Sequence, residues 1–202
     1  IKSEKRIVGG FAGKRGGKTE GFAVKVVKEI EEKQKWIPNG IDPFLTLIIA
    51  PTTEMMRSLS MKKFRAYGDP FMLRDHSNET RNEHKWHDHF KVPGGNEIIG
   101  MSADKPKRIE GKKANIIWLD EIFQMEEQVF LECRARIADS KGKLFCSGSL
   151  GVQYVNPKNH WAYKYFKQSP DENTVCFEWA TADNPYFPKD ELDSLKNSLD
   201  PR

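Results

Sequence analysis

Apolar residues along the chain form two kinds of run, one continuous and one spaced like the buried face of a helix. The continuous runs predict buried strands at about residues 5–10, 44–52, 114–119, 142–149 and 174–179. The spaced runs predict helices at about residues 20–30, 54–67, 160–166 and 189–199, with another helical stretch beginning near Gln124. Strands that alternate with helices predict an α/β fold, in which helices cover both faces of a mostly parallel sheet.

Glycine and proline mark where several of these elements end. In the first strand, the apolar pair Ile7 and Val8 is followed by Gly9 and Gly10, which we expect to end the strand. Residues 75–100 are polar and rich in histidine, with a turn at 93–96 that predicts two short strands, 90–92 and 97–99.

The turn between the first strand and the first helix has the composition of a phosphate-binding loop. Residues 12–19 match the pattern G-x-x-x-x-G-K-[ST] except that Ala12 replaces the first glycine. Backbone N–H groups and the helix N-terminus would face the phosphates, Lys18 would neutralise them, and Thr19 would bind Mg2+. The residues predicted to bind nucleotide are Gly13, Lys14, Arg15, Gly16, Gly17, Lys18 and Thr19. The alternative is a glycine-rich turn before an ordinary helix.

Two carboxylates follow the apolar run 114–119 directly. Asp120 and Glu121 would therefore lie at the carboxyl edge of a central strand, where open α/β sheets bind ligands. Asp120 can hold a water bound to Mg2+, and Glu121 can orient and deprotonate the attacking water. The alternative is an acidic helix N-terminus. Together with the loop, the pair predicts an ATPase of the motor or helicase type.

Composition sets broad limits on this interpretation. The 202 residues can bury one α/β core with a small appended subdomain, and the net charge of +4 is modest. Basic residues gather in two groups, which fit either a solvated face or contact with a polyanion. The groups are Lys2, Lys5, Arg6, Lys14, Arg15 and Lys18, and Lys105, Lys107, Arg108, Lys112 and Lys113.

The cysteines, the longest apolar runs and the start of the chain indicate the compartment and the kind of polypeptide. Cys133, Cys146 and Cys176 are far apart, which argues against a disulfide scaffold or zinc site and fits a reducing cytoplasm. The sequence shows neither an apolar run long enough to span a membrane nor a signal peptide. Because the chain begins at Ile1, almost inside the first strand, we interpret it as a fragment or a trimmed domain.

The histidine-rich stretch gives little support for a metal site. His84, His87 and His89 match no standard zinc spacing, and a fourth ligand is not evident. We expect surface histidines in a polar loop, with DNA contact as a further option. We expect Trp86 and Trp161 to serve in packing rather than in base stacking.

Taken together, these motifs resemble the ATPase domain of the large terminase subunit, the DNA-packaging motor of tailed bacteriophages. The resemblance covers nearly the whole chain. It rests on the phosphate loop, Ile48–Thr52, Ser102–Pro106 before the acidic strand, Asp120–Glu121, Ser147–Ser149, and the ending Thr181–Tyr186.

The resemblance implies a P-loop NTPase of the ASCE type, with a core at 1–152, a lid subdomain at 153–202, and the family's nuclease domain absent. It implies ATP hydrolysis with Mg2+, powering translocation of double-stranded DNA in the host cytoplasm. The implied partners are the portal of the procapsid, the small terminase subunit and copies of the chain in a ring, usually of five, with no membrane. Ser147, Gly148 and Ser149 would couple hydrolysis to motion.

The sequence departs from the family pattern at several positions. Lys14 replaces a common arginine, Glu110 stands where some members place an arginine that acts on a neighbouring subunit, and the coupling motif lacks its proline. Arg108 is the nearby substitute for a catalytic arginine, since that role needs a permanent planar cation. The adenine-binding segment, usually upstream of the first strand, is missing or displaced.

Two other functions remain open at this stage. A helicase-like translocase would share both nucleotide motifs and the Ala50–Thr52 segment, but it should carry a second motor domain or helicase-specific motifs. A nucleotide-binding switch or scaffold would not hydrolyse ATP, and Glu121 argues against that interpretation.

Overall fold

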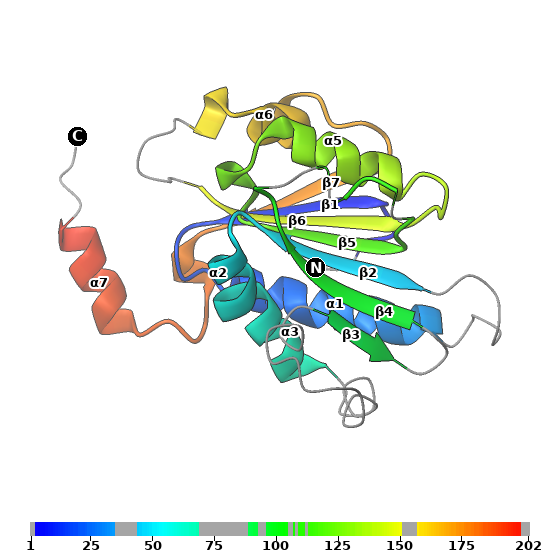
Figure 1. The fold of residues 1–202 in the computed structure, drawn as a ribbon. Helices are drawn as coiled ribbons and strands as arrows, with labels where there is room; N and C mark the ends of the chain where they lie inside the picture. The colour runs from blue at the N-terminus through cyan, green and yellow to red at the C-terminus, as the bar shows by residue number, and fades with distance from the viewer. Residues whose placement is uncertain are drawn as a thin grey trace.

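A twisted, mostly parallel sheet forms the centre of the molecule (Figure 1). The computed structural model describes residues 3–34, 44–68, 89–92, 96–104, 107, 109–111, 113–150 and 157–198. In these ranges the sheet has seven strands in the order β3-β4-β2-β5-β6-β1-β7. Their bounds are β1 Ile7–Ala12, β2 Leu45–Ala50, β3 His89–Val92, β4 Asn96–Ser102, β5 Ile116–Asp120, β6 Lys143–Ser149 and β7 Thr174–Trp179. Only the β3–β4 pair is antiparallel among these described strands.

Helices cover both faces of the sheet, which confirms the predicted α/β architecture (Figure 1). The α-helices of six residues or more are α1 Lys18–Gln34, α3 Lys62–Tyr67, α5 Glu127–Arg136 and α7 Lys189–Ser198. The other helical pieces are α2 Thr53–Met55, η1 Met56–Met61, η3 Ile122–Gln124, η4 Pro157–Asn159, α6 Trp161–Tyr163, η5 Lys164–Gln168 and η6 Thr181–Asp183. In Figure 1, α1 and α3 lie on one side of the sheet, α5 and α6 on the other.

Alternate residues of the strands feed two separate hydrophobic cores. Ile117 and Leu119 of β5 face the core that α5 and η5 cover, whereas Ile116 and Trp118 face the core under α1 and α3. This alternation follows from the two-residue period of a strand. A strand buried on both faces must be apolar throughout, which is why the continuous runs predicted central strands correctly.

The first strand does not end at its glycines as we expected, and this prediction was wrong. β1 continues through Gly9 and Gly10 to Ala12. Aromatic rings pack directly over both glycines: a Cβ on Gly10 would lie 2.3 Å from Cε2 of Phe22, and one on Gly9 would lie 2.7 Å from Cδ1 of Phe166. The glycines therefore serve close packing of helices on the strand, a use that the sequence pattern alone does not distinguish from a turn.

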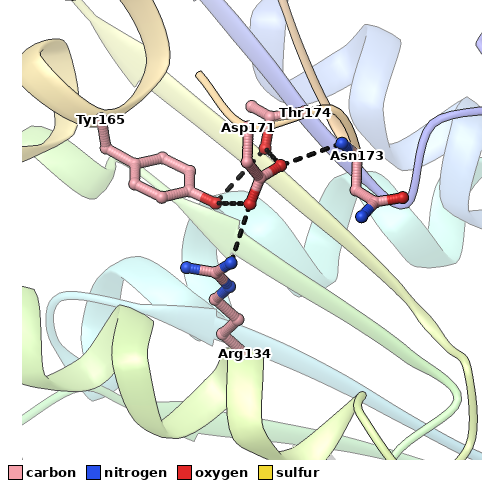
Figure 2. A network of polar contacts seen from close by, with 5 residues as sticks. All are labelled: Arg134, Tyr165, Asp171, Asn173 and Thr174. Atoms are coloured by element: carbon pink, nitrogen blue, oxygen red, sulfur yellow. Dashed lines mark hydrogen bonds and ion pairs between the residues drawn. The ribbon is translucent and has the colours of Figure 1, made fainter. Parts of the chain in front are cut away.

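A polar network anchors the chain just before β7 (Figure 2). Asp171 accepts hydrogen bonds from Tyr165 (3.0 Å), Thr174 (2.7 Å) and the backbone N–H of Asn173 (3.0 Å). The Arg134 guanidinium of α5 forms an ion pair with the same carboxylate at 2.7 Å. These contacts hold the start of β7 against α5 and η5.

The strand that this network anchors belongs to the central sheet. Thr174–Trp179 pairs in parallel with β1 along its whole length. We expected residues 153–202 to form a lid, and the division at residue 152 stays a prediction. Any separate lid would have to be built without β7, because that strand completes the edge of the core sheet.

The helices were also compared with what a membrane span requires. None of the helices in the described part of the chain combines the length and the apolar character that crossing a bilayer requires.

Candidate functional site

The phosphate loop joins β1 to α1 at the carboxyl edge of the sheet. Arg15 and Gly17 have positive φ angles of 61° and 77°, and the N–H of Gly16 donates to the carbonyl of Gly13 at 3.2 Å. Such tight turns before a helix aim successive backbone N–H groups into one concave space. The loop therefore has the shape that an anionic group needs, at the N-terminus of a seventeen-residue helix.

Lys18 lies folded into this loop. Its side chain is buried, and Nζ donates to the carbonyl of Gly13 at 3.0 Å. Burial lowers the pKa of Lys18, while the nearby carboxylates Glu121 and Asp120 partly oppose that effect. The amine therefore lies close enough to the acidic pair for its charge to interact with both carboxylates.

Asp120 is the last residue of β5 and is 1% exposed. Its Oδ1 accepts hydrogen bonds from the hydroxyls of Ser147 at 2.6 Å and Thr19 at 3.4 Å. Its Oδ2 accepts one from the hydroxyl of Ser60 at 2.7 Å. Burial raises the pKa of Asp120 to about 6; the charge of Glu121 acts in the same direction, and the three hydroxyls act against it. Among the described residues none forms an ion pair with this carboxylate.

The surroundings of Asp120 fit a magnesium ion. A buried carboxylate that accepts hydrogen bonds from neutral hydroxyls, and that forms no ion pair within the described residues, gains too little stabilisation of its ionised form to offset its burial. Asp120 and the Thr19 hydroxyl offer the oxygen ligands that Mg2+ prefers. No group of three or more His, Cys, Asp or Glu residues that could hold a metal occurs in the described part of the chain. A Mg2+ ion here would take its remaining ligands from water and phosphate.

Glu121 occupies a left-handed backbone conformation, with φ 60° and ψ 49°. This conformation is costly for a residue with a side chain, and such strained residues cluster at functional sites. The Glu121 carboxylate accepts hydrogen bonds from the backbone N–H of Ser149 at 3.0 Å and from its hydroxyl at 2.9 Å. The backbone turn and these two bonds fix the second carboxylate beside the end of β6.

The residues predicted to couple hydrolysis to motion lie directly on the acidic pair. Ser147 binds Asp120 and also accepts the indole N–H of Trp118 at 2.9 Å, and Ser149 binds Glu121. A Cβ on Gly148 would lie 2.7 Å from Cδ2 of Phe123. Both carboxylates are therefore hydrogen-bonded to the end of β6.

One functional candidate was missed by the sequence analysis. The stretch 54–67 is helical as predicted, but its middle, Met56–Met61, is a π-helix, and Ser60 lies within it. π-helical turns inside longer helices often occur at functional sites, and here the turn presents a hydroxyl to Asp120. Hydrophobic spacing alone does not reveal such a turn.

The end of β7 and the segment that follows it are hydrogen-bonded to the backbone of the phosphate loop. Trp179 Nε1 donates to the carbonyl of Gly16 at 2.6 Å, the Thr181 hydroxyl to that of Lys14 at 2.8 Å, and Asn184 Nδ2 to that of Arg15 at 2.8 Å. The sequence analysis noted Thr181–Tyr186 only as part of a resemblance. Its contacts make it one wall of the site.

Other predicted residues lie apart from the site or outside the described residues. Arg108, His84, His87 and Trp86 lie outside them. Glu110 is exposed in a turn, and His89 lies 3.4 Å from the carboxylate of Glu97 across the β3–β4 pair. Trp161 packs against Phe130, with ring centroids 5.2 Å apart, in agreement with the packing role we expected.

Sequence comparison identifies a family for most of the chain. A family model described as "Terminase large subunit, T4likevirus-type, N-terminal" matches residues 10–193, a span that includes the loop and the acidic pair. No curated protein matches the sequence.

Solved structures show the same fold. The large terminase of a thermophilic bacteriophage superposes with a TM-score of 0.68 at 16% identity, covering 96% of this chain and 45% of that one. A variant of the Thermus phage P74-26 large terminase ATPase domain gives 0.66 at 18% identity, covering 98% and 84%. The thermophilic bacteriophage protein in complex with ADP gives 0.65 at 14% identity, covering 96% and 44%. The chain spans less than half the length of that bacteriophage protein, and the likeness supports the predicted P-loop NTPase fold.

Proposed function

Because the chain belongs to the family of T4-like terminase large subunits, we propose that it hydrolyses ATP and that this hydrolysis drives double-stranded viral DNA into a procapsid. One observation carries the proposal. The phosphate loop and the acidic pair, about a hundred residues apart in sequence, meet at one edge of the sheet, where Thr19 contacts Asp120 at 3.4 Å.

The loop residues hold the triphosphate. Gly13, Gly16 and Gly17 leave room for phosphate oxygens against the backbone, while Lys14 and Arg15 add positive charge around the loop. On binding, the Lys18 amine exchanges the Gly13 carbonyl for phosphate oxygens. Burial destabilises the charged form of Lys18, as its lowered pKa indicates, and the negative charge of the phosphates would stabilise that form. This exchange favours the nucleotide-bound state of the loop.

Thr19 and Asp120 are the residues that would hold Mg2+ with the nucleotide. The ion would neutralise charge that develops on the phosphates during hydrolysis. The hydroxyls of Ser60 and Ser147 keep the Asp120 carboxylate in place for this role.

Glu121 orients the attacking water and accepts its proton. Its two bonds to Ser149 leave further lone pairs on the carboxylate for that water. When the γ-phosphate leaves, a shift of the two carboxylates moves Ser147 and Ser149, which are hydrogen-bonded to them, and so moves the end of β6. Arg108, or an arginine of a neighbouring subunit, completes the charge stabilisation.

The proposed assembly follows from the family. It is a ring of chains, of five in the usual case, that works in the host cytoplasm with the portal of the procapsid, the small terminase subunit and double-stranded DNA. The match to the thermophilic bacteriophage terminase supports nucleotide binding, because one structure of that protein is a complex with ADP. A helicase-like translocase remains the second candidate, since both nucleotide motifs are shared with that class.

The test is steady-state ATP hydrolysis of the chain against Glu121→Ala, with Glu127→Ala as the control. Glu127 is exposed and lies in the first turn of α5, six residues further on. We expect Glu121→Ala to lose turnover but keep ATP binding, Glu127→Ala to behave as the parent, and procapsids to stimulate the parent. Turnover that persists in Glu121→Ala removes this residue from the role of base. Stimulation by nucleic acid alone favours the helicase-like interpretation.

A further inference from the structure

The loop after β1 and the segment after β7 leave the sheet side by side. β1 and β7 are parallel neighbours, and their last residues, Ala12 and Trp179, are paired in register. Parallel strands in register end at the same edge of a sheet. The chain after each strand therefore starts at the same level, although the two strands are far apart in sequence.

Three side chains at the end of β7 and just beyond it bind the backbone of the phosphate loop. They donate hydrogen bonds to three consecutive carbonyls, those of residues 16, 14 and 15, at 2.6, 2.8 and 2.8 Å. In the same order, these loop-contacting residues are Trp179, Thr181 and Asn184.

The direction of these bonds determines what the opposite side of the loop presents. The C=O and N–H of a trans peptide point in opposite directions, and the described part of the chain has no cis peptide bond. Carbonyls held toward the segment after β7 therefore turn the N–H groups of the next residues, Arg15, Gly16 and Gly17, away from it. Backbone N–H groups turned to one side are what a loop needs to receive a phosphate.

The contacts also hold a residue that is costly to keep in place. Arg15 has a positive φ of 61°, which is unfavourable for a residue with a side chain. Asn184 binds the carbonyl of Arg15, while its own side-chain oxygen accepts the N–H of Tyr186 at 3.1 Å, which orients the amide. The Asp183 carboxylate accepts the N–H of Ala180 at 2.8 Å, so the segment is bonded internally as well.

Two glycines of the loop lie against the same side chains. The pattern G-x-x-x-x-G-K-[ST] leaves positions 13 and 16 open to any residue. A Cβ on Gly13 would collide with the Thr181 hydroxyl oxygen, and the three atoms nearest to it all belong to Thr181. One on Gly16 would lie 2.9 Å from Cβ of Ala12 and 3.3 Å from Nε1 of Trp179. Gly13 in particular admits a side chain that binds the loop.

We propose that Trp179, Thr181 and Asn184 are positioning residues, which hold the phosphate loop in its binding conformation before a nucleotide arrives. The inference rests on the proposed ATP site in the loop. It concerns the backbone of the loop alone, and these residues need not touch the ligand. A loop that is already ordered does not have to be ordered on binding, and this raises its affinity for phosphates.

The experiment uses Thr181→Val, which removes the hydroxyl and keeps the shape of the side chain. Calorimetry compares two probes, Mg·ATP and Mg·tripolyphosphate, the second of which has no base or ribose. We expect the Kd to rise by the same factor for both probes, roughly fivefold, as the loss of one hydrogen bond implies. Thr181→Ser keeps the hydroxyl and should bind both probes like the parent.

Steady-state turnover gives a second readout. Thr181→Val should raise the KM for ATP and leave kcat near that of the parent, because bound phosphates hold the loop once the site is filled. The matched control is Thr174→Val. The Thr174 hydroxyl donates to the Asp171 carboxylate at 2.7 Å, at the other end of β7 (Figure 2), so its loss does not touch the loop. The control should leave the Kd of both probes unchanged.

Hydrogen exchange tests the hold on the loop without any ligand. In the nucleotide-free chain, the peptide that contains residues 13–17 should exchange faster in Thr181→Val than in the parent or in Thr174→Val. Equal exchange in the three proteins overturns the inference.

The outcomes separate this inference from the proposed function. Unchanged Kd values for both probes in Thr181→Val overturn the positioning role and leave the phosphate site intact. Weakening of ATP binding alone also overturns it, since Thr181 would then act on the nucleoside rather than on the loop. A parent chain that binds neither probe overturns the proposed function, and the inference with it.

Discussion

Two buried carboxylates, near opposite ends of the parallel strands, have different hydrogen-bond and ion-pair partners. Glu29, on α1, is 2% exposed and forms ion pairs with Lys25 at 2.6 Å and with Lys143, the first residue of β6, at 2.8 Å. Asp120, at the end of β5, is 1% exposed and receives only hydroxyl hydrogen bonds among the described residues.

The pKa values of the two groups differ accordingly. Burial alone would raise the pKa of Glu29, but hydrogen bonds and charge from Lys143 and Lys25 outweigh it and hold the pKa below its ordinary value. At Asp120 burial prevails and the pKa rises to about 6. The first carboxylate is compensated within the protein and joins a helix to a strand. The second forms no ion pair within the described residues, and we propose that a cation from outside the chain compensates it.

The largest expected effect is at Asp120. Its pKa of about 6, raised from 3.8, means that the ionised carboxylate opposes folding at neutral pH by roughly 3 kcal/mol. We therefore expect Asp120→Asn to stabilise the metal-free protein by roughly this amount at pH 8, while ATP turnover is lost. Urea unfolding in EDTA measures the first effect, and a phosphate-release assay measures the second.

The same variant has a defined pH dependence. Below pH 4 the carboxyl is protonated in both the folded and unfolded states, so the parent and Asp120→Asn should have similar stability. Between about pH 4 and 6 the unfolded state ionises first, and the advantage of the asparagine should grow with pH. A variant that is less stable than the parent at pH 8 contradicts the contrast between the two carboxylates.

Glu29→Gln should have the opposite sign. Loss of the shared carboxylate leaves Lys25 and Lys143 without their partner, and we expect a cost of roughly 2 kcal/mol in the free energy of unfolding at pH 7. Because the pKa of Glu29 is lowered, its contribution is present above the unfolded pKa and disappears as the pH falls through the folded value. The difference between parent and variant should therefore shrink in acid.

Glu32→Gln, an exposed change on the same helix, is the control and should leave stability near that of the parent. Turnover per folded Glu29→Gln molecule should also match the parent, since Glu29 lies at the far edge from the loop. A loss of turnover in fully folded Glu29→Gln protein would mean that the two edges are not independent.

The sequence predicted the residues around Asp120, at the carboxyl end of the strands, but not the buried ion pairs of Glu29 at the other end. Lys18, Thr19, Asp120 and Glu121 stand in short motifs whose meaning depends on local spacing, and parallel strands bring their ends together. Lys25 and Glu29 have the i,i+4 spacing of a helical ion pair, but the second partner, Lys143, lies 114 residues away on another element, so the sequence did not reveal this buried carboxylate. Helical periodicity found the segment with Ser60, yet it could not reveal the π-helical turn there.

The glycines of β1 show a further limit. The same residue type ends strands and admits close packing, and only the rings of Phe22 and Phe166 over Gly10 and Gly9 distinguish these uses. That information is tertiary, since Phe166 is distant in sequence. Motifs defined by chemistry were thus easier to interpret than single residues defined by their neighbours in space.

The smallest expected effect is at Ser60, and it tests whether the hydroxyls around Asp120 act on that carboxylate. Ser60→Ala removes the donor 2.7 Å from Asp120 Oδ2, and we expect a loss of about 1 kcal/mol in stability at pH 8. In a double-mutant cycle with Asp120→Asn most of that loss should vanish, because the charged acceptor is gone.

Ser58→Ala is the matched control, since the Ser58 hydroxyl donates to the Glu54 carbonyl at 2.7 Å, within the same helical segment. Its effect should be equal in both backgrounds. Equal effects of Ser60→Ala in both backgrounds would instead show that the π-helical turn serves packing alone, and that Asp120 is held by Ser147 and Thr19 without it.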